Sequence, residues 1–216
     1  MQSIVVTDSN PIVRIREYAP GITIHWLVGT RCNFDCSYCP DQWHDKTSKD
    51  YSLEKLQAAW IRIMSASPKK NIKYNLSFLG GEPTLNKNFL PFLKWLHECF
   101  AQHLGNVGVI TNGTASLEYY KEMINYCDWI TFSTHSEFMK EKKFFNLVVN
   151  LHQIAQSHKC LVSVNIMDES WHQSRNKQYK TFLEKHGIVS YTHPIKDFGQ
   201  GKKQFPIKVT NQMEFL

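Results

Sequence analysis

The stretch RCNFDCSYCP (residues 31–40) places three of the chain's six cysteines within eight positions. Cys32, Cys36 and Cys39 follow a C-x3-C-x2-C spacing, and no fourth cysteine lies beside them. Thiolates on one short loop suit an iron–sulfur cluster, whose irons usually take four such ligands. With three thiolates, one iron stays open to atoms of a substrate or cofactor. The alternative is a zinc site completed by His44, since zinc also binds three cysteines and one histidine.

Around this loop the sequence alternates between strand and helix patterns. Segments that predict strands lie at 22–29, 73–81, 106–114, 128–136, 160–168 and 188–195. Segments with helical periodicity lie at 52–66, 88–104, 116–127, 142–157 and 175–187. Such alternation predicts a parallel sheet with right-handed crossovers, with too few strands for a closed eight-stranded barrel. The predicted fold class is α/β, either a partial (β/α)6 TIM-like barrel or a doubly wound sheet.

The alternation of side chains within the strands favours the partial barrel. In one strand the apolar residues Ile130 and Phe132 alternate with Thr131, Ser133 and His135. A flat sheet with helices on both faces would show continuous apolar runs. One apolar and one polar face instead suit a parallel curved sheet with helices outside and a ligand cavity inside. The active site of such a sheet lies at the carboxyl ends of its strands.

The chain divides into three predicted parts. Residues 22–195 carry the strand and helix pattern of the core, residues 1–21 form an N-terminal extension able to make a hairpin, and residues 196–216 form a basic tail. The balance of 25 basic and 19 acidic residues gives a net charge of +6, spread over local lysine runs. Such runs are typical of a solvated surface and argue against nucleic acid as a partner.

The apolar stretches and the isolated cysteines indicate in which cellular compartment the protein is expected. No stretch approaches the roughly 18 apolar residues of a membrane span, and the start lacks the pattern of a signal peptide. Cys99, Cys127 and Cys160 are scattered singly through apolar segments, as small buried hydrophobes usually are. This usage suits a reducing compartment, so we expect a cytoplasmic protein without a membrane partner.

Glycine and polar motifs follow the ends of the next strands. In FLGGEPTL (78–85) the glycines allow a close backbone approach, and Glu82 offers a carboxylate at the rim for a ligand's ammonium group. ITNGT (110–114) ends the third predicted strand, although an Asn-Gly turn alone would explain it. Ser133 and Asn165 lie toward the same ends of two further strands. Each alone fits structural hydrogen bonding, whereas together they predict one ligand-binding edge.

The order CNFDCSYCP, GGEP, TNG resembles that of the radical S-adenosylmethionine superfamily, over residues 22–195. The resemblance implies that Cys32, Cys36 and Cys39 hold a catalytic [4Fe–4S] cluster whose fourth iron chelates S-adenosylmethionine. The positions that match the family's cofactor-binding residues are Tyr38, Gly80, Gly81, Glu82, Thr111, Asn112, Ser133 and Asn165. By this resemblance, the glycines and Glu82 would bind the amino end of the methionine part, and Tyr38 would approach the adenine through its backbone. The other four residues would contact the carboxylate and the ribose of S-adenosylmethionine.

The resemblance also implies a reaction: reductive cleavage of S-adenosylmethionine to a 5′-deoxyadenosyl radical that abstracts hydrogen from a substrate. We expect a small single-cluster enzyme, or a chain without its C-terminal domain, served by a low-potential electron donor such as flavodoxin or ferredoxin. The expected substrate is a small polar or nucleotide-derived molecule. Inward-facing candidates for substrate contact are His25, Asn75, Ser77, His135 and Ser163. The alternatives are a peptide- or protein-modifying enzyme, a glycyl-radical activase that docks through the basic tail, and a non-catalytic zinc-binding interaction module.

Overall fold

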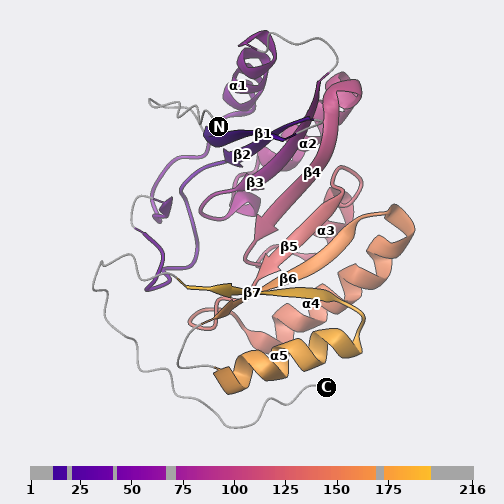
Figure 1. The fold of residues 1–216 in the computed structure, drawn as a ribbon. Helices are drawn as coiled ribbons and strands as arrows, with labels where there is room; N and C mark the ends of the chain where they lie inside the picture. Colours follow the sequence, from indigo (N-terminus) through magenta and orange to yellow (C-terminus); the bar gives the residue numbers. More distant parts are fainter. Residues whose placement is uncertain (1–11, 19–20, 41–42, 67–71, 169–172, 196–216) are drawn as a thin grey trace.

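One sheet organises the fold (Figure 1). The computed structural model describes residues 12–18, 21–40, 43–66, 72–168 and 173–195. Within these residues seven strands follow one another in chain order: β1 (Ile12–Tyr18), β2 (Gly21–Leu27), β3 (Lys73–Leu79), β4 (Leu104–Thr111), β5 (Trp129–Ser133), β6 (Leu161–Asp168) and β7 (Val189–Pro194). Neighbours from β2 to β7 are parallel, and β1 lies antiparallel to β2 at the edge.

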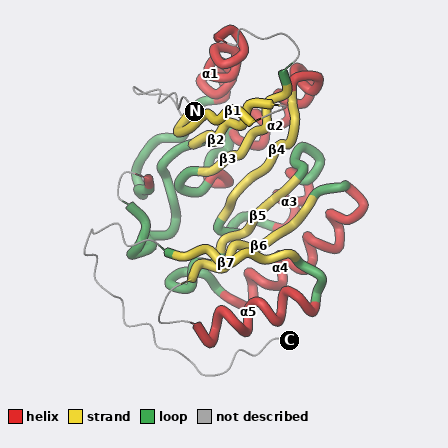
Figure 2. Tube along the Cα trace, in the orientation of Figure 1, coloured by secondary structure: helices red, strands yellow, loops and turns green. Residues whose placement is uncertain are grey.

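The helices lie in the crossovers between the parallel strands. They are α1 (Leu53–Ala66), α2 (Phe89–Phe100), α3 (Leu117–Met123), α4 (Glu141–Ala155) and α5 (Gln173–Lys185). Figures 1 and 2 show α2 to α5 along one side of the curved sheet. The strand order never reverses, whereas a doubly wound sheet reverses at a switch point. The predicted α/β partial (β/α)6 barrel is therefore confirmed, and the doubly wound alternative is wrong.

The predicted N-terminal extension enters the sheet through β1. Its pairing runs from Ile12 opposite Trp26 to Tyr18 opposite Gly21, so the hairpin is made with the first parallel strand. The basic tail (196–216) lies outside the described residues and stays a prediction. Among the helices of the described ranges, none combines the length and the apolarity that crossing a membrane requires.

Most strands end earlier than the sequence pattern predicts, whereas β6 ends at Asp168 as predicted. The predicted strand 128–136 ends at Ser133, and the carbonyl of His135 accepts the N–H groups of Phe138 and Met139 at 3.0 and 2.8 Å. These bonds turn the chain toward α4. The residues beyond the strand thereby form loop structure at the carboxyl edge, where a rigid scaffold can position functional side chains.

An aromatic cluster packs the first helices against the sheet. Trp26 on β2 is fully buried. Its ring centroid lies 6.4 Å from that of Trp60 on α1, 5.6 Å from Phe78 on β3 and 5.2 Å from Phe92 on α2. Aromatic side chains bury large apolar areas and dominate core energetics. This cluster holds β2 and β3 together just before the loops that follow them.

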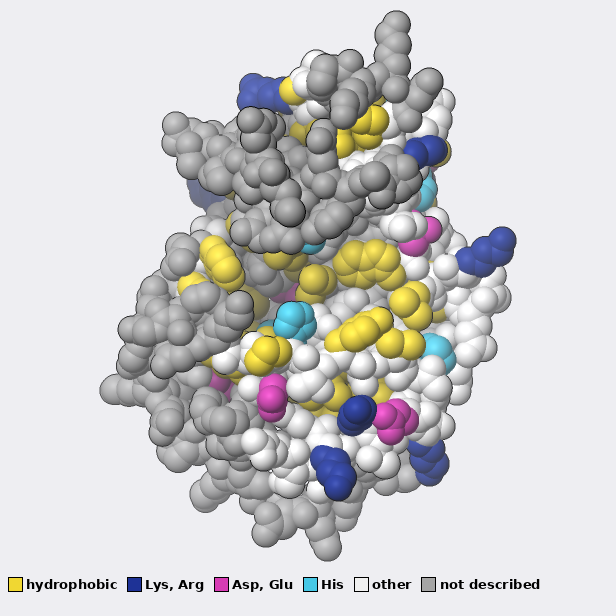
Figure 3. All heavy atoms as spheres, in the orientation of Figure 1, with side chains coloured by type: hydrophobic (Ala, Val, Ile, Leu, Met, Phe, Trp, Pro, Cys, Tyr) yellow, Lys and Arg dark blue, Asp and Glu magenta, His cyan; other side chains and the backbone are white. Residues whose placement is uncertain are grey.

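The face of the sheet that carries the polar positions is amphipathic. Thr131 Oγ1 and Ser163 Oγ are buried and lie 2.9 Å apart. Ser163 pairs in register with Val189, and paired residues share a face of the sheet. Leu161, Val189 and Tyr191 are 46%, 41% and 54% exposed. Figure 3 shows apolar side chains gathered across the middle of the visible face. The predicted polar surface therefore also presents apolar groups.

Gly81 lies where the chain after β3 touches the chain after β2. Its N–H donates to the Gly29 carbonyl at 2.9 Å, and the Glu82 N–H donates to the Arg31 carbonyl at 2.8 Å. A Cβ on Gly81 would lie 2.3 Å from the carbonyl oxygens of both Thr30 and Arg31. Because these are backbone atoms, no side-chain rotation can relieve the overlap. Only glycine fits this contact.

Replacing Gly81 with alanine is therefore expected to lower the free energy of unfolding by about 1–3 kcal/mol, the usual cost of overpacking a closely packed site. Gly29→Ala is the matched control, because a Cβ on Gly29 meets no atom within 4 Å. Urea unfolding of the two full-length variants measures the difference. Equal midpoints and slopes would contradict the steric argument.

Candidate functional site

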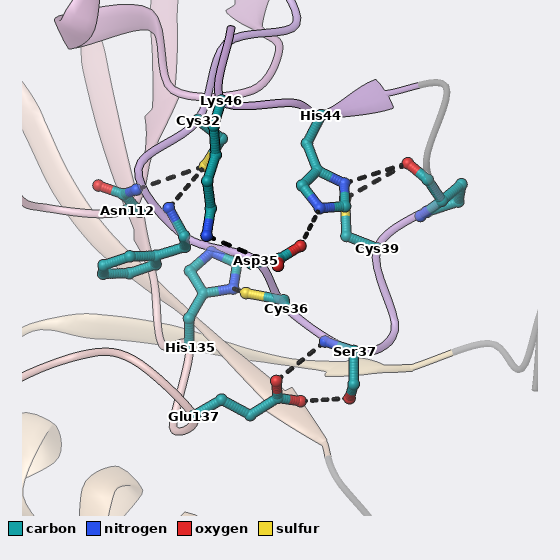
Figure 4. A network of polar contacts seen from close by, with 12 residues as sticks. Cys32, Asp35, Cys36, Ser37, Cys39, His44, Lys46, Asn112, His135 and Glu137 are labelled. Atoms are coloured by element: carbon teal, nitrogen blue, oxygen red, sulfur yellow. Dashed lines mark hydrogen bonds and ion pairs between the residues drawn. The ribbon is translucent and has the colours of Figure 1, made fainter. Parts of the chain in front are cut away.

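The cysteine loop follows β2 at the carboxyl edge of the sheet (Figure 4). The Cys32 N–H donates to the Asp45 carbonyl at 2.7 Å, and the Asp45 N–H donates to the Thr30 carbonyl at 2.9 Å. On another side, Asn33 Nδ2 donates to Thr114 Oγ1 at 3.0 Å, beyond β4. The start of the loop is thus tied both to its own return segment and to the end of a neighbouring strand.

The three thiols of the loop meet different neighbours. Cys32 Sγ lies 3.4 Å from the Phe34 nitrogen, whose N–H donates to it. Cys36 Sγ lies 3.5 Å from His135 Nδ1, and Cys39 Sγ lies 4.0 Å from the Pro40 carbonyl oxygen. Burial raises the pKa of Cys36, and the negative charge of Glu137 adds to this shift. Burial also raises the pKa of Cys32. Iron binding would replace these protons, because the thiolate is the form that ligates a metal.

His44 does not complete a zinc site with these cysteines. Its ring is 7% exposed, Nδ1 lies 3.2 Å from the Pro40 carbonyl and Nε2 lies 3.0 Å from Asp35 Oδ1. Both nitrogens are therefore already engaged. Across the described ranges, no three His, Cys, Asp or Glu side chains are grouped as the ligands of one metal ion. Three thiols on one loop are the kind of donor that an iron–sulfur cluster takes, and they supply three of its usual four ligands.

Glu82 lies inside the protein and not at the rim that the sequence predicts. It is 3% exposed. Oε1 accepts the Thr84 N–H at 3.0 Å and the hydroxyls of Thr84 and Thr111 at 2.7 Å each, and Oε2 accepts the Asn112 N–H at 2.6 Å. Burial raises the pKa of Glu82, and the four hydrogen bonds oppose this by favouring the carboxylate. This carboxylate joins the ends of β3 and β4.

Thr111 and Asn112 connect this buried carboxylate to the cysteine loop. The Thr111 hydroxyl also lies 2.8 Å from the Tyr120 hydroxyl. Asn112 Nδ2 donates to Asn33 Oδ1 at 2.8 Å and lies 3.9 Å from Cys32 Sγ. The structure thus brings three of the sequence motifs, the cysteines, GGE and TNG, into one continuous set of contacts.

The next strand ends bring further predicted residues to the loop. Ser133 ends β5 and pairs in register with Asn165, which lies three residues before the end of β6 at Asp168. His135, just beyond β5, has its Nδ1 2.6 Å from the Tyr38 hydroxyl and stands beside Cys36. Burial lowers the pKa of His135 to about 4, so its ring is neutral near pH 7. The structure places His135 against the cysteine loop, and its contact with a substrate stays a prediction.

The other predicted substrate contacts lie deeper in the sheet. His25 and Ser77 pair in register on β2 and β3, and Ser163 bonds to its neighbour on β5 as described above. Asn75 lies near the amino end of β3, where its Oδ1 accepts the Asn106 N–H at 2.8 Å. The structure therefore places Asn75 away from the carboxyl edge, in a structural hydrogen bond.

One contact of the cysteine loop had no signal in the sequence. The Ser37 N–H donates to Glu137 Oε2 at 2.9 Å, and the Ser37 hydroxyl donates to Glu137 Oε1. These residues are 100 positions apart; Ser37 lies within the cysteine motif, whereas Glu137 belongs to no motif that the sequence shows. A contact of this kind depends on the path of the chain between β5 and α4, and local sequence patterns do not specify that path.

Comparison with known proteins gives the chain a family. A model of the Radical SAM superfamily matches residues 26–166. The GTP 3′,8-cyclase of Rhizobium leguminosarum bv. trifolii (strain WSM2304) is 29% identical over 124 residues, which are 56% of this chain and 34% of that protein. The chain thus spans about a third of the length of this relative.

Solved structures of low sequence identity share the fold. Native anSMEcpe with bound AdoMet has a TM-score of 0.59 at 18% identity, over 80% of this chain and 51% of that one. Streptococcus suis SuiB bound to precursor peptide SuiA has a TM-score of 0.55 at 15% identity, over 79% and 38%. The matched part of this chain therefore spans about half the length of these structures or less. Since the family model covers more than half of its 216 residues, the chain belongs to the radical SAM superfamily, whose enzymes use a [4Fe–4S] cluster and S-adenosylmethionine.

Proposed function

We propose that Cys32, Cys36 and Cys39 are the cluster ligands of this enzyme and that its substrate is a small polar or nucleotide-derived molecule. One observation carries the proposal: the cysteine loop is bonded to the GGE segment through Gly81 and Glu82 and to the end of β4. Bound together, the cluster and S-adenosylmethionine supply a hydrogen-abstracting 5′-deoxyadenosyl radical. The protein's part is to bind, to orient and to exclude competing hydrogen donors.

In this proposal the GGE segment binds the methionine amino group through its backbone. The Glu82 carboxylate is used by internal donors, so Glu82 acts as a positioning residue that holds the ends of β3 and β4. Asn112 orients the loop beside Cys32. Tyr38 contributes its backbone to adenine binding, because its hydroxyl is engaged by His135.

The remaining cofactor contacts come from the middle of the sheet. Ser133 and Asn165 are proposed for the carboxylate and ribose, since they pair in register on one face of β5 and β6. Thr111 pairs with Phe132 on the other face and its hydroxyl donates to Glu82, so Thr111 is better explained as a partner of the buried carboxylate. His25 and Ser77 are proposed to meet the substrate from the polar face. Asn75 is better explained by its bond to the β4 backbone.

The similarity to a GTP 3′,8-cyclase supports a nucleotide-derived substrate. A peptide is the second candidate, because Leu161, Val189 and Tyr191 expose apolar surface on the same side of the sheet as the polar groups. A flavodoxin or ferredoxin would supply the electron. A cytoplasmic location belongs to the same proposal and is supported by the free thiols of all six cysteines.

Cys36→Ala is expected to abolish both cluster assembly and S-adenosylmethionine cleavage, because two thiolates from the loop would remain. Iron content and 5′-deoxyadenosine formation in the anaerobically reconstituted protein measure the two effects. Cys99→Ala is the matched control, since Cys99 is an exposed thiol on α2. Undiminished 5′-deoxyadenosine from the Cys36 variant would refute the ligand assignment. A colourless wild-type protein that retains zinc would favour the interaction module.

Glu82→Gln is expected to destabilise the fold and to weaken S-adenosylmethionine binding. The amide offers one acceptor oxygen where the carboxylate offers two, so at least one buried N–H loses its partner, at about 1–3 kcal/mol. Urea unfolding and equilibrium binding measure the two consequences. Glu118→Gln removes an exposed carboxylate paired with Lys121 and should leave both unchanged. Wild-type behaviour of the Glu82 variant would exclude the positioning role.

Deuterium transfer distinguishes the two substrate classes. The reduced enzyme is incubated with GTP deuterated on its ribose, or with peptides deuterated at side-chain and α carbons. We expect deuterium in 5′-deoxyadenosine from the nucleotide and none from the peptides, and mass spectrometry measures it. Transfer from peptides alone would replace the proposed substrate class with the second candidate.

A further inference from the structure

The loop between β5 and α4 (residues 134–140, called the β5–α4 loop) is hydrogen-bonded to the middle of the cysteine loop. Figure 4 shows Glu137 reaching Ser37 with both carboxylate oxygens. Oε2 accepts the Ser37 N–H at 2.9 Å, and Oε1 accepts the Ser37 hydroxyl. A carboxylate that takes two donors from one residue fixes both the position and the backbone orientation of that residue.

Three ring contacts join the two loops on either side of Ser37. Phe34 stacks on Phe138 with ring centroids 5.6 Å apart, and it meets the His135 ring edge-on at 5.8 Å. Tyr38 lies parallel to His135 at 6.1 Å, with its hydroxyl 2.6 Å from Nδ1. The five residues from Phe34 to Tyr38 are thus held by the β5–α4 loop.

The Glu137 carboxylate has an electrostatic consequence because Ser37 directly follows Cys36. Its charge lies beside a proposed cluster ligand, and a nearby negative charge disfavours adding an electron to a cluster. It also occupies the Ser37 N–H, and an N–H donated to a cluster sulfur would favour reduction. Net charge and hydrogen bonds to sulfur are both established determinants of cluster reduction potential. The two effects act in the same direction, toward a lower potential.

From this geometry we propose that Glu137 is a positioning residue that holds the Cys36–Ser37 backbone and keeps the reduction potential of the bound cluster low. The inference rests on the proposed function, since it takes Cys36 as a cluster ligand. It assigns a role to a residue outside the cysteine, GGE and TNG motifs. A low potential is the property that electron transfer to a sulfonium requires of the cluster.

The test compares the reduction potential of the reconstituted full-length wild type with that of Glu137→Gln, by redox titration monitored by electron paramagnetic resonance. We expect a positive shift for Glu137→Gln, since the charge is lost and the amide cannot accept both Ser37 donors. Ser37→Ala keeps the charge and the N–H bond and should shift the potential much less. Glu118→Gln, which removes an exposed carboxylate on α3, should leave it unchanged.

The outcomes separate this inference from the proposed function. A Glu137→Gln protein that holds the cluster at the wild-type potential would overturn the inference and leave the ligand assignment intact. A wild type that assembles no cluster would instead overturn the proposed function. If Glu137→Gln assembles no cluster, Glu137→Asp decides the matter: its shorter side chain should lengthen the contact to Ser37 and shift the potential positively, and an unshifted potential would overturn the role of Glu137.

Discussion

The buried carboxylate of Glu82 is the constraint on which the site depends. A carboxylate at 3% exposure is costly unless donors surround it, and here those donors come from the ends of two neighbouring strands. Satisfying it therefore brings Thr111 and the Asn112 backbone to the segment after β3. The same segment touches the carbonyls of Thr30 and Arg31 through Gly81. One buried carboxyl group thereby aligns the ends of β3 and β4 beside the chain that follows β2.

The cysteine loop has little regular structure of its own and takes its shape from these neighbours. Gly81 and Glu82 hold its start, Asn112 and Thr114 hold Asn33, and the β5–α4 loop holds its middle. These contacts come from the segments that follow β3, β4 and β5, so the loop conformation depends on how these three strand ends lie beside β2. A parallel strand order is what brings all these ends to one edge.

Sequence patterns predict the fold and the motifs but not how the motifs are used. Strand and helix periodicity is a local property, and it predicts the parallel order and the single face that helices cover. The GGE motif is visible in the sequence, yet the burial of Glu82 depends on Thr111 and Asn112 arriving from β4. Glu137 has no local signature, because its partner Ser37 lies 100 residues earlier. The role of Asn75 also depends on a backbone group from another strand.

The exposed apolar residues of the sheet lie on other strands than the contacts that hold the cysteine loop. The groups that fix the cysteine loop come from the ends of β2 to β5, whereas the exposed apolar residues Leu161, Val189 and Tyr191 lie on β6 and β7. None of these three has a hydrogen bond to the loop among the described contacts, and two belong to the edge strand. Under the proposed function, substitutions at these positions would change substrate binding and leave the contacts of Glu82 and Glu137 in place. The conformation of the cysteine loop depends on its contacts with the segments after β3, β4 and β5, and the described contacts include none between this loop and β7.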